Sequence, residues 1–384
     1  MKAGWQIKKL RDVCTLINGR AYKKSELLSE GKYPVLRVGN FFTNNHWYYS
    51  DLELDGNKYC DSGDLLYAWS ASFGPRIWDG GKVIFHYHIW KVIPDAHQID
   101  QSFLFHFFLW DMEQIKKDRG AGTTMLHVSK GSMEDRDILL PPLTEQQRIV
   151  AILDEAFDGI SKARANAEKN LQNARELFDS YLQSIFILRA DGWKEKRLGS
   201  IAEVQSGGTP LVSNKDFWNG DIAWYSSGEL NNRYTSDPER KITTNGLKGS
   251  NAKLFPAGSL LIGMYDTAAL KMSILDRDAA FNQAVAGVRP NGEIDLTFIL
   301  HAINAKKPIL LSQRRGVRQK NLSLSKIKDI TFNMPQRPEQ EAVVARLDAY
   351  AVEIQHLESL YQAKIEALNE LKKSLLHQAF RGKL

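Results

Sequence analysis

The chain has 384 residues, 43% of them hydrophobic and 25% charged, which is typical of a soluble globular protein with two or three domains. No apolar run approaches the ~18 residues that a membrane span needs, and the N-terminal MKAGWQIKKLRD lacks the apolar stretch of a signal peptide. With Cys14 and Cys60 as the only cysteines, the sequence argues against a disulfide framework and predicts a cytoplasmic location.

The net charge of +6 is distributed unevenly. Residues 189–336 carry 21 basic and 14 acidic side chains, whereas residues 1–142 carry 18 and 17. A basic segment is a mild indication of a polyanionic partner. Because the first segment is nearly neutral, charge alone does not establish nucleic-acid binding.

One domain-sized unit occurs twice in the sequence. The run LPPLTEQQRIVAILDEAFDGI, beginning at Leu140, matches MPQRPEQEAVVARLDAYAVEI, which begins 194 positions later at Met334. The unit is far longer than the period of a solenoid. The sequence therefore predicts two copies of one module, and a function that needs some feature of the module twice. Shifts of 188 to 195 relate further pairs: Trp5 and Trp193, Gly19 and Gly207, Phe103 and Phe298, His106 and His301, Phe186 and Phe380.

The expected elements alternate along the chain as globular segment, helix, globular segment, helix. Residues 1–142 and 189–336 contain short β-rich runs (KYPVLRV, KVIFHYHIWKVI, DIAWYS, SLLIGMY) separated by Gly, Asn, Asp and Ser turns. We expect short helices at 101–118 and 295–313. The fold class predicted is α+β, with long helices over 143–188 and 337–384.

Both long helices carry a heptad seam without internal proline. Pro141-Pro142 precede the first, and Thr144-Glu-Gln-Gln147 fits a capping box. At ~1.5 Å per residue each helix spans about 60 Å. An antiparallel coiled coil, with an approximate internal two-fold, would bury both seams; the alternative is that each helix packs on its own domain. The expected helix-pair interface comprises Leu153, Ile160, Asn170 and Leu177 in the first helix, and Leu347, Ile354, Leu357, Lys364, Leu368 and Leu371 in the second.

Asn170 and Lys364 are strongly polar positions in these seams, and they lie 194 residues apart. One interpretation is that Lys364 extends its ammonium group to solvent and Asn170 is a tolerated flaw. The other is that both fix the register and orientation of the coil. The sequence leaves both open.

No catalytic motif is present. The sequence contains no Walker A site and no glycine-rich dinucleotide fingerprint, since RGAGTT at 119–124 has the wrong spacing; the [DNS]-P-P-[YFW] signature of amino-methyltransferases is also missing. Glu239-Arg-Lys241 with Asp221 resembles a nuclease triplet that the first copy lacks. His86 and His88, two apart on an expected strand, could bind zinc with His97 or Cys60. Because the second copy has no matching set, strand histidines are favoured, and we expect no metal site and no enzyme.

Loops at matching places in both copies carry side chains suited to bases and phosphates. Arg reads guanine, Asn and Gln read adenine, and Lys attracts phosphate. A single loop of this composition is usually just exposed to solvent. The recurrence of such loops at matching places in both copies is what indicates a function. The candidate DNA-binding residues are Arg20, Tyr22, Lys23, Lys24, Asn44, Asn45, Ser72, Arg76, Thr123, Thr124 and Lys130 in the first module, and Thr209, Ser226, Ser227, Asn231, Asn232, Arg233, Arg314, Arg315, Arg318, Gln319 and Lys320 in the second.

Over nearly its whole length the chain resembles the specificity subunit of type I restriction-modification systems. The most specific segments are PPLTEQQRIVAILD and MPQRPEQEAVVARLD, each opening a long helix. GWKEKRLGSIAEVQSGGTP, the stretch 316–325 and the terminal LLHQAFRGKL are also similar to the family. The first module departs from the family's loop pattern, because GDLLYAWSASFGP stands there in place of the pattern found in the second module.

This resemblance implies two target-recognition domains, 1–142 and 189–336, that alternate with two spacer helices. Each domain would read one half of a split, asymmetric sequence in double-stranded DNA. The helices would set the spacing and dock two methyltransferase subunits, and restriction subunits would join them. It implies no cofactor for this chain, S-adenosylmethionine on the methyltransferase subunits, and ATP and Mg²⁺ on the restriction subunits. The 207–210, 226–234 and 314–321 segments would contact DNA, with 19–24, 39–48 and 119–130 as counterparts.

Three other functions remain open from the residues. The chain could be a non-catalytic coiled-coil scaffold that binds proteins, or an enzyme with an unrecognised site in 61–90. It could also be the recognition subunit of a methylation-only or phage-defence assembly.

Overall fold

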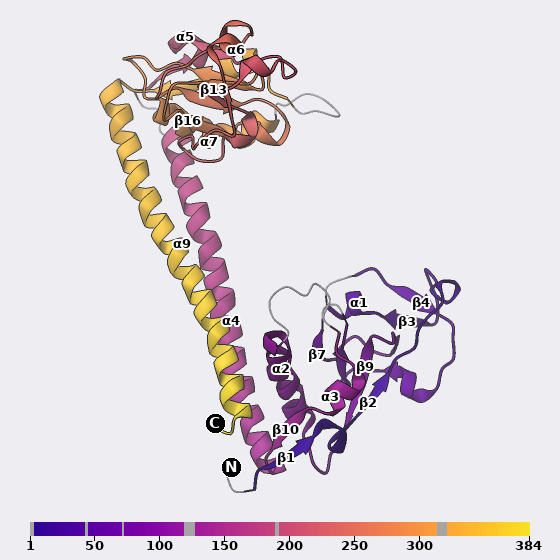
Figure 1. Ribbon diagram of the computed structural model, residues 1–384. Helices are drawn as coiled ribbons and strands as arrows, with labels where there is room; N and C mark the ends of the chain where they lie inside the picture. Colours follow the sequence, from indigo (N-terminus) through magenta and orange to yellow (C-terminus); the bar gives the residue numbers. More distant parts are fainter. Residues whose placement is uncertain (1–3, 43–44, 71–72, 119–126, 189–191, 313–320) are drawn as a thin grey trace. The chain divides into compact units, whose positions relative to one another are not determined.

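The computed structural model describes residues 4–42, 45–70, 73–118, 127–188, 192–312 and 321–384. The chain divides into two compact units, unit 1 (Met1–Glu168 with Gln362–Leu384) and unit 2 (Lys169–Tyr361). Each contains one globular domain, hereafter a module, and parts of two long helices, α4 (Leu143–Gln183) and α9 (Arg337–Phe380) (Figure 1). The compact units therefore cut across the long helices.

The module of unit 1 contains two four-stranded sheets, ordered β2-β9-β6-β7 and β4-β3-β8-β5, and a two-stranded ribbon of β1 with β10. Its elements are β1 (Gln6–Lys9), β2 (Cys14–Asn18), β3 (Tyr33–Leu36), α1 (Val38–Phe42), β4 (Tyr48–Ser50), β5 (Tyr59–Cys60), β6 (Leu65–Ala68), β7 (Gly74–Ile77), β8 (Val83–Phe85), β9 (Ile89–Pro94), α2 (Gln101–Asp118), α3 (Lys130–Glu134) and β10 (Asp137–Leu140).

The module of unit 2 contains a four-stranded sheet, β12-β18-β15-β16, a three-stranded sheet, β14-β13-β17, and a ribbon of β11 with β19. Its elements are β11 (Lys194–Arg197), α5 (Leu198–Ile201), β12 (Val204–Ser206), β13 (Trp218–Tyr225), β14 (Arg240–Ile242), α6 (Thr244–Lys248), β15 (Leu260–Gly263), β16 (Met272–Ile274), β17 (Ala279–Phe281), β18 (Val285–Val288), α7 (Leu296–Ser312), α8 (Leu324–Lys328) and β19 (Thr331–Met334).

The repeat in the sequence is a repeat in the fold. β1 pairs antiparallel with β10, and β11 pairs in the same way with β19. Each module has one parallel strand pair, β3 with β8 and β13 with β17. A Cβ at Gly19 would lie 2.3 Å from the Phe85 carbonyl oxygen, and one at Gly207 would lie 2.0 Å from that of Phe281. Both copies therefore need glycine at the same close approach of two backbones.

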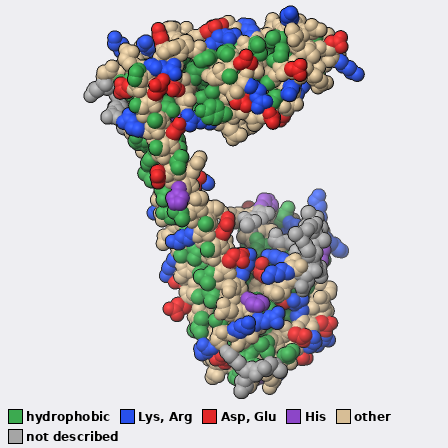
Figure 2. All heavy atoms as spheres, turned by 60° about the vertical axis from the view of Figure 1, so that its left-hand side comes forward, with side chains coloured by type: hydrophobic (Ala, Val, Ile, Leu, Met, Phe, Trp, Pro, Cys, Tyr) green, Lys and Arg blue, Asp and Glu red, His purple; other side chains and the backbone are tan. Residues whose placement is uncertain are grey.

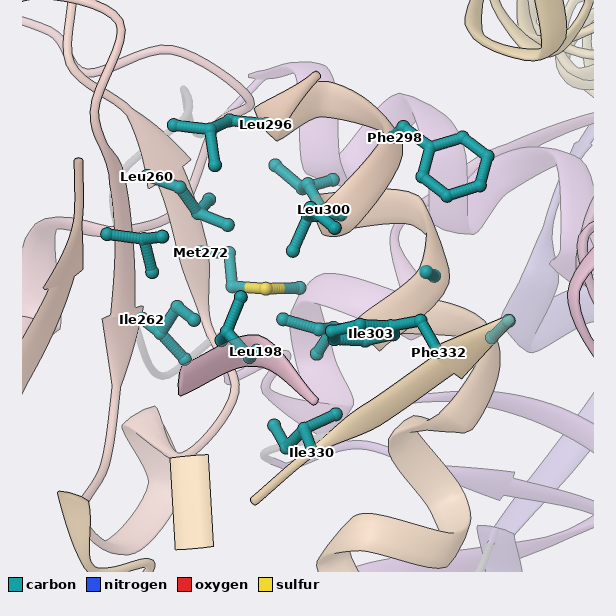
Figure 3. Packing of buried hydrophobic residues seen from close by; sticks show 14 of the residues in the cluster. Leu198, Leu260, Ile262, Met272, Leu296, Phe298, Leu300, Ile303, Ile330 and Phe332 are labelled. Atoms are coloured by element: carbon teal, nitrogen blue, oxygen red, sulfur yellow. The ribbon is translucent and has the colours of Figure 1, made fainter. Parts of the chain in front are cut away.

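The core of each module includes both long helices at one end. In unit 2, α7 packs Leu300 and Ile303 against Leu260 and Ile262 of β15, beside Phe332 of β19 (Figure 3). The start of α9 and the end of α4 belong to the same core. In unit 1 the roles are exchanged, because the start of α4 and the end of α9 join that core. The helix ends are thus buried on their modules, as the alternative interpretation expected.

α4 and α9 also pair with each other, antiparallel, as predicted. Within unit 1 the Lys372 ammonium lies 4.8 Å from the ring centre of Phe157. Within unit 2 the rings of Tyr181 and Tyr350 lie 4.7 Å apart, and Arg175 forms an ion pair with Glu358 at 3.3 Å. The early part of α4 therefore packs on the late part of α9, and the late part of α4 on the early part of α9.

The seam differs from the predicted one at four positions. Leu153, Ile160, Leu347 and Ile354 are buried, while Leu357 and Leu368 are half-buried. Asn170 and Lys364 are exposed, as are Leu177 (50%) and Leu371 (47%), so these four do not form the interface. Their neighbours Leu171 and Phe178 are half-buried, and Ile365 is buried.

The reason for the shift is the helical period. A straight helix turns once every 3.6 residues and drifts away from a strict seven-residue repeat, so the buried stripe takes an 11-residue step. This step runs from Ile354 to Ile365 in α9, so Lys364 faces solvent, whereas α4 keeps Ile160, Ala167 and Ala174 buried at seven-residue intervals with Asn170 exposed between them. Neither exposed residue is the buried register-fixing group that one interpretation proposed.

The short elements agree with expectation in most places. α2 covers 101–118 and α7 covers 296–312. The run KVIFHYHIWKVI was expected as one strand, but it forms β8 and β9 with a turn between them. His86 and His88 therefore lie in the connection between the two strands and do not share one strand face. Across the described residues, no helix combines the length and apolar character that a membrane crossing requires.

Candidate nucleic-acid interface

The predicted loops converge at one edge of each module, where the parallel strands end. In unit 1, Leu36 lies opposite Phe85, so the segments that follow β3 and β8 leave the sheet together. The backbone of Arg20 donates to the Phe85 carbonyl at 3.0 Å, which brings the 19–24 segment to the same edge. The carboxyl ends of parallel strands share an edge, which is a frequent place for binding sites.

Unit 2 repeats this convergence. Tyr225 lies opposite Phe281 at the ends of β13 and β17. The backbone of Gly208 donates to the Phe281 carbonyl at 2.9 Å, as Arg20 does in unit 1. The structure thus brings together the predicted segments 207–210 and 226–234, and in unit 1 their counterparts 19–24 and 39–48.

A polar cavity of about 440 Å³ opens at this edge in unit 1. Its lining includes Arg37, Tyr48, His86 and His88. The Arg37 guanidinium lies 5.2 Å from the ring centre of Tyr48, and the two imidazole rings are 4.9 Å apart. Burial lowers the pKa of His86 to about 4, and the nearby His88 and Arg37 add to the effect. Burial, together with His127, also lowers the pKa of His88, so both rings are neutral at physiological pH.

A second cavity, of about 530 Å³, lies at the corresponding edge of unit 2. Thr209, Asn251, Lys253 and Gln283 line it together with the backbone of the 206–208 segment. The Thr209 hydroxyl donates to Gln283 Oε1 at 2.5 Å. Amide side chains, a hydroxyl group and one lysine form a lining with hydrogen-bonding groups that base edges and phosphates require.

Several predicted residues in unit 1 have structural partners. Arg20 forms two hydrogen bonds with Glu26, at 2.8 and 3.0 Å, and Arg76 donates to Asp79 and to the Phe41 carbonyl. The Tyr22 hydroxyl lies 3.5 Å from the Phe85 carbonyl, and Lys130 lies 3.5 Å from Glu134. Lys23, Lys24 and Asn45 are exposed. The exposed lysines and Asn45 thus remain available to a ligand, while Arg20 and Arg76 already hold carboxylates.

In unit 2 the loop after β13 is internally bonded. The Ser226 amide donates to Glu229 at 2.7 Å, and half-buried Ser227 begins the 3₁₀ turn that carries Glu229. Lys271 donates to Asn231 at 2.8 Å, whereas Asn232 is exposed. Among the other predicted residues, Asn44, Ser72, Thr123, Thr124, Arg314, Arg315, Arg318, Gln319 and Lys320 lie outside the described residues.

Arg233, a predicted DNA-binding residue, forms an ion pair with the long helix α9. Its guanidinium donates to both carboxylate oxygens of Asp348 in α9, at 2.6 and 3.1 Å. A bidentate pair of this kind fixes both groups. The sequence showed Arg233 in a polar loop but not its partner, which lies 115 residues away.

The repeat explains this contact. Asp154 of α4 is the counterpart of Asp348, and it accepts a hydrogen bond from His106 Nε2 at 2.8 Å. His301, the counterpart of His106, lies 4.0 Å from Asp348. Burial lowers the pKa of His301 to about 4 and also lowers that of His106, so neither ring carries a charge at neutral pH. In unit 2, Arg233 thus makes with Asp348 the contact that His106 makes with Asp154 in unit 1.

A buried glutamine at the start of each long helix makes a second repeated contact. Gln146 Oε1 accepts from the Asp100 amide at 2.8 Å, and its Nε2 donates to the Pro141 and Gln98 carbonyls. Gln340 accepts in the same way from the Asp295 amide at 2.8 Å. These residues were visible in the sequence as the repeated Glu-Gln pair, but their role was not predicted. They fix the helix start against the loop that leads into α2 or α7.

Among the described residues, no group of three or more His, Cys, Asp and Glu side chains could hold a metal ion. On the face of unit 2 that Figure 2 shows, Lys and Arg side chains are interspersed with Asp and Glu, so this face is not uniformly cationic.

Comparison with known proteins agrees with this architecture. The family model of the type I restriction modification DNA specificity domain matches residues 2–169 and again residues 190–367. The EcoBI specificity subunit of Escherichia coli is 21% identical over 99% of this chain and 86% of its own length. The MjaVIII specificity subunit of Methanocaldococcus jannaschii is 23% identical over 99% and 93%. The EcoR124I/EcoR124II specificity subunit of Escherichia coli is 27% identical over 54% and 52%.

Solved structures share the fold. A chain from a type I R-M system, solved to explain complex assembly and conformational transition, has a TM-score of 0.80 at 18% identity and covers 100% of this chain and 99% of itself. The HsdS subunit from Thermoanaerobacter tengcongensis has a TM-score of 0.64 at 18% identity and covers 100% and 98%. With the two domain matches spanning most of its length, this chain belongs to the family of type I restriction-modification DNA specificity domains.

Proposed function

We propose that this chain is the DNA-recognition subunit of a type I restriction-modification complex and reads a split, asymmetric target with one half-site per module. The observation that carries the proposal is the repeated edge. Each module places a polar cavity at the carboxyl ends of its parallel strands, and the two linings differ in chemistry. Equivalent sites with different side chains suit two different half-sites, because the scaffold is kept while the specificity changes.

The chain itself would catalyse no reaction. Its relatives are specificity subunits, and no catalytic motif occurs in its sequence. Methylation and cleavage would come from two methyltransferase subunits and from restriction subunits, which would bring S-adenosylmethionine, ATP and Mg²⁺. The target-recognition domains would be 1–142 and 189–336, with 143–188 and 337–384 as the spacer helices.

Exposed apolar side chains on the long helices support the docking of two like partners. Leu177 and Leu371 are half exposed and are 194 residues apart, so the same apolar position recurs once in each repeat. Val352 (63%) and Leu360 (51%) add further exposed apolar area on α9. Exposed apolar residues on a helix suit a protein partner, and a repeated one suits a partner present in two copies.

The test is the sequence that becomes methylated in cells carrying this chain and its partner subunits. A split asymmetric motif, with two specific parts and a fixed unspecific gap, is expected. A protein scaffold would leave methylation independent of this chain. Challenging the same cells with unmodified DNA distinguishes a restriction system from a methylation-only assembly, because only the former will cleave it.

A further inference from the structure

We propose that the cavity lined by Arg37, Tyr48, His86 and His88 reads a guanine in the half-site of the first module, with Arg37 as the side chain that contacts the base. The inference rests on the proposed function and makes it more specific. Tyr48 lies in the 39–48 segment that the sequence indicated, but Arg37, His86 and His88 were not among the expected DNA-binding residues, which placed the cations of the first module at 20–24, 76 and 130.

Arg37 differs from the two predicted arginines of its module. Arg20 and Arg76 each hold a carboxylate, of Glu26 and Asp79. No carboxylate in the described part of the chain forms an ion pair with Arg37, which is exposed directly after β3. Its guanidinium lies over the Tyr48 ring at 5.2 Å. A cation–π contact restricts the rotation of the group and leaves its N–H donors directed to a ligand.

Two histidines in the wall of the cavity are neutral. His86 and His88 lie close together beneath Arg37, and burial keeps both rings uncharged. Among the lining residues Arg37 carries the permanent positive charge. Phosphate groups are attracted by several cations or by helix N-termini, whereas one guanidinium beside neutral hydrogen-bonding rings suits the uncharged edge of a base.

The arrangement of donors favours guanine. Arginine presents two parallel N–H groups, and guanine presents two adjacent acceptors, O6 and N7, in the major groove. Adenine offers one acceptor beside a donor, and cytosine offers a donor, so neither matches the pair. A neutral imidazole can donate or accept one further hydrogen bond to the neighbouring base.

The second module lacks this arrangement at the matching positions. Leu36 and Tyr225 occupy equivalent places opposite Phe85 and Phe281. The residue that follows is Arg37 in one module and Ser226 in the other. Guanine recognition through this position is therefore assigned to the first half-site alone.

The experiment uses the full chain assembled with its methyltransferase subunits. Duplex oligonucleotides carry the methylated motif with each of the four bases at every specified position, and methylation rates are compared. Arg37→Ala should remove discrimination at one guanine of a single half-site, by roughly tenfold to a hundredfold. The other half-site should keep its specificity. Arg37→Lys should lose discrimination as well, because one ammonium cannot form the paired contact.

Lys82 provides a matched control. It lies in the same module, and its ammonium also lies over a tyrosine ring, Tyr59, at 4.9 Å, but it precedes β8 at the opposite end of the strand. Lys82→Ala should leave the sequence preference unchanged. The thermal midpoint of each variant verifies folding, and exposed Arg37 should be replaceable without loss of stability.

Other outcomes would overturn the assignment. If Arg37→Ala weakens methylation equally at all sequences and flattens the salt dependence by about one contact, while Arg37→Lys restores both, Arg37 binds phosphate. An unchanged preference in both variants would exclude Arg37 from the interface. Failure of the unaltered complex to methylate any split motif would instead refute the proposed function.

Discussion

Gln146 and Gln340 show how a single buried side chain fixes the start of a long helix. Both are buried, at 0% and 1% exposure. Each accepts from one backbone amide and donates to two carbonyls, so three backbone groups depend on it. Since a buried polar group without a partner is costly, these glutamines stabilise the junction between module and helix.

Gln340→Ala should therefore destabilise unit 2. Leaving the Asp295 amide and two carbonyls without partners costs about 2–4 kcal/mol, which for a unit of this size lowers Tm by roughly 5–15 °C. Gln336→Ala is the matched control, because Gln336 is exposed and precedes the same helix. Thermal unfolding of the full chain measures both. Equal Tm values for the two variants would contradict the role assigned to Gln340.

His301 predicts a dependence of stability on pH. Burial, with the charge of Arg233, lowers its pKa from the ordinary value to about 4. The unfolded chain then binds a proton more readily than the folded one, so this contribution is present above pH ~6.5 and is lost as the pH falls toward 4.

We expect His301→Gln to flatten the fall of Tm between pH 6.5 and pH 4.5 relative to the unaltered protein. The difference between the two curves isolates this residue from the carboxylates, which titrate in both. His356→Gln replaces an exposed histidine of α9 and should keep the original curve. Parallel curves for His301→Gln and the unaltered chain would show that His301 is readily protonated in the fold.

At the scale of elements, the pairing of α4 with α9 depends on a buried stripe that departs from a strict heptad. In the middle of α9, Ile365 is buried, at 8% exposure, while the adjacent Lys364 is exposed. A helix with 3.6 residues per turn drifts by about 20° per heptad relative to a strict seven-residue repeat, so the residue that faces the partner changes along a long helix. The structure therefore distinguishes the buried Ile365 from the exposed Lys364, which the sequence pattern could not do.

Substitution by aspartate should destabilise the protein more at buried positions of α9 than at exposed ones. Ile365→Asp buries an unpaired charge and should cost several kcal/mol. Leu357→Asp should cost less, because Leu357 is half-buried, and Lys364→Asp should change the free energy of unfolding by less than about 1 kcal/mol. Denaturant titration of the three variants gives the comparison. If Lys364→Asp were the most damaging, the heptad seam first predicted from the sequence would be the correct one.

At the scale of the whole molecule, each module needs the end of a helix that starts at the other repeat. Phe380, near the end of α9, packs on Phe103 and Phe107 of unit 1, with ring centres 5.1 and 5.6 Å apart. Phe186, its counterpart after α4, packs on Phe298 of unit 2 at 5.0 Å. The same aromatic contact closes both cores.

A half-chain of residues 1–188 should therefore form a homodimer. It contains one module and one helix, and the Phe186 of a second copy can take the place of Phe380. Pairing should be weaker than in the intact chain, because covalent linkage raises the effective concentration, and the alanine-rich seam of α4 buries less area than that of α9. Sedimentation measures the pairing, and Phe186→Ala should abolish it.

With methyltransferase partners, this dimer should methylate a palindromic split sequence built from the first half-site. Modification of the parent's asymmetric site by the half-chain would refute the assignment of one half-site to each module. A folded half-chain that stays monomeric at high concentration would refute the exchange of Phe186 for Phe380.

The sequence by itself determined the repeat, the α+β class, the two long helices and the family. These follow from local signals: helix starts at Pro141-Pro142 and at Pro335, sustained apolar periodicity, and segments matched at a fixed spacing. α2 over 101–118 was predicted to the residue, because its apolar run is long and follows a capping aspartate, Asp100.

Only the tertiary structure decided which polar residues are committed to the fold. Arg20, Arg76 and Arg233 looked like ligands for DNA, yet Glu26, Asp79 and Asp348 hold them. Arg37, His86 and His88 became a candidate site only when two strands brought them together. The sequence gives the type of each polar side chain. Whether that side chain is free to bind a ligand depends on the groups that the tertiary fold places beside it. For that reason the architecture was predictable and the reading surface was not.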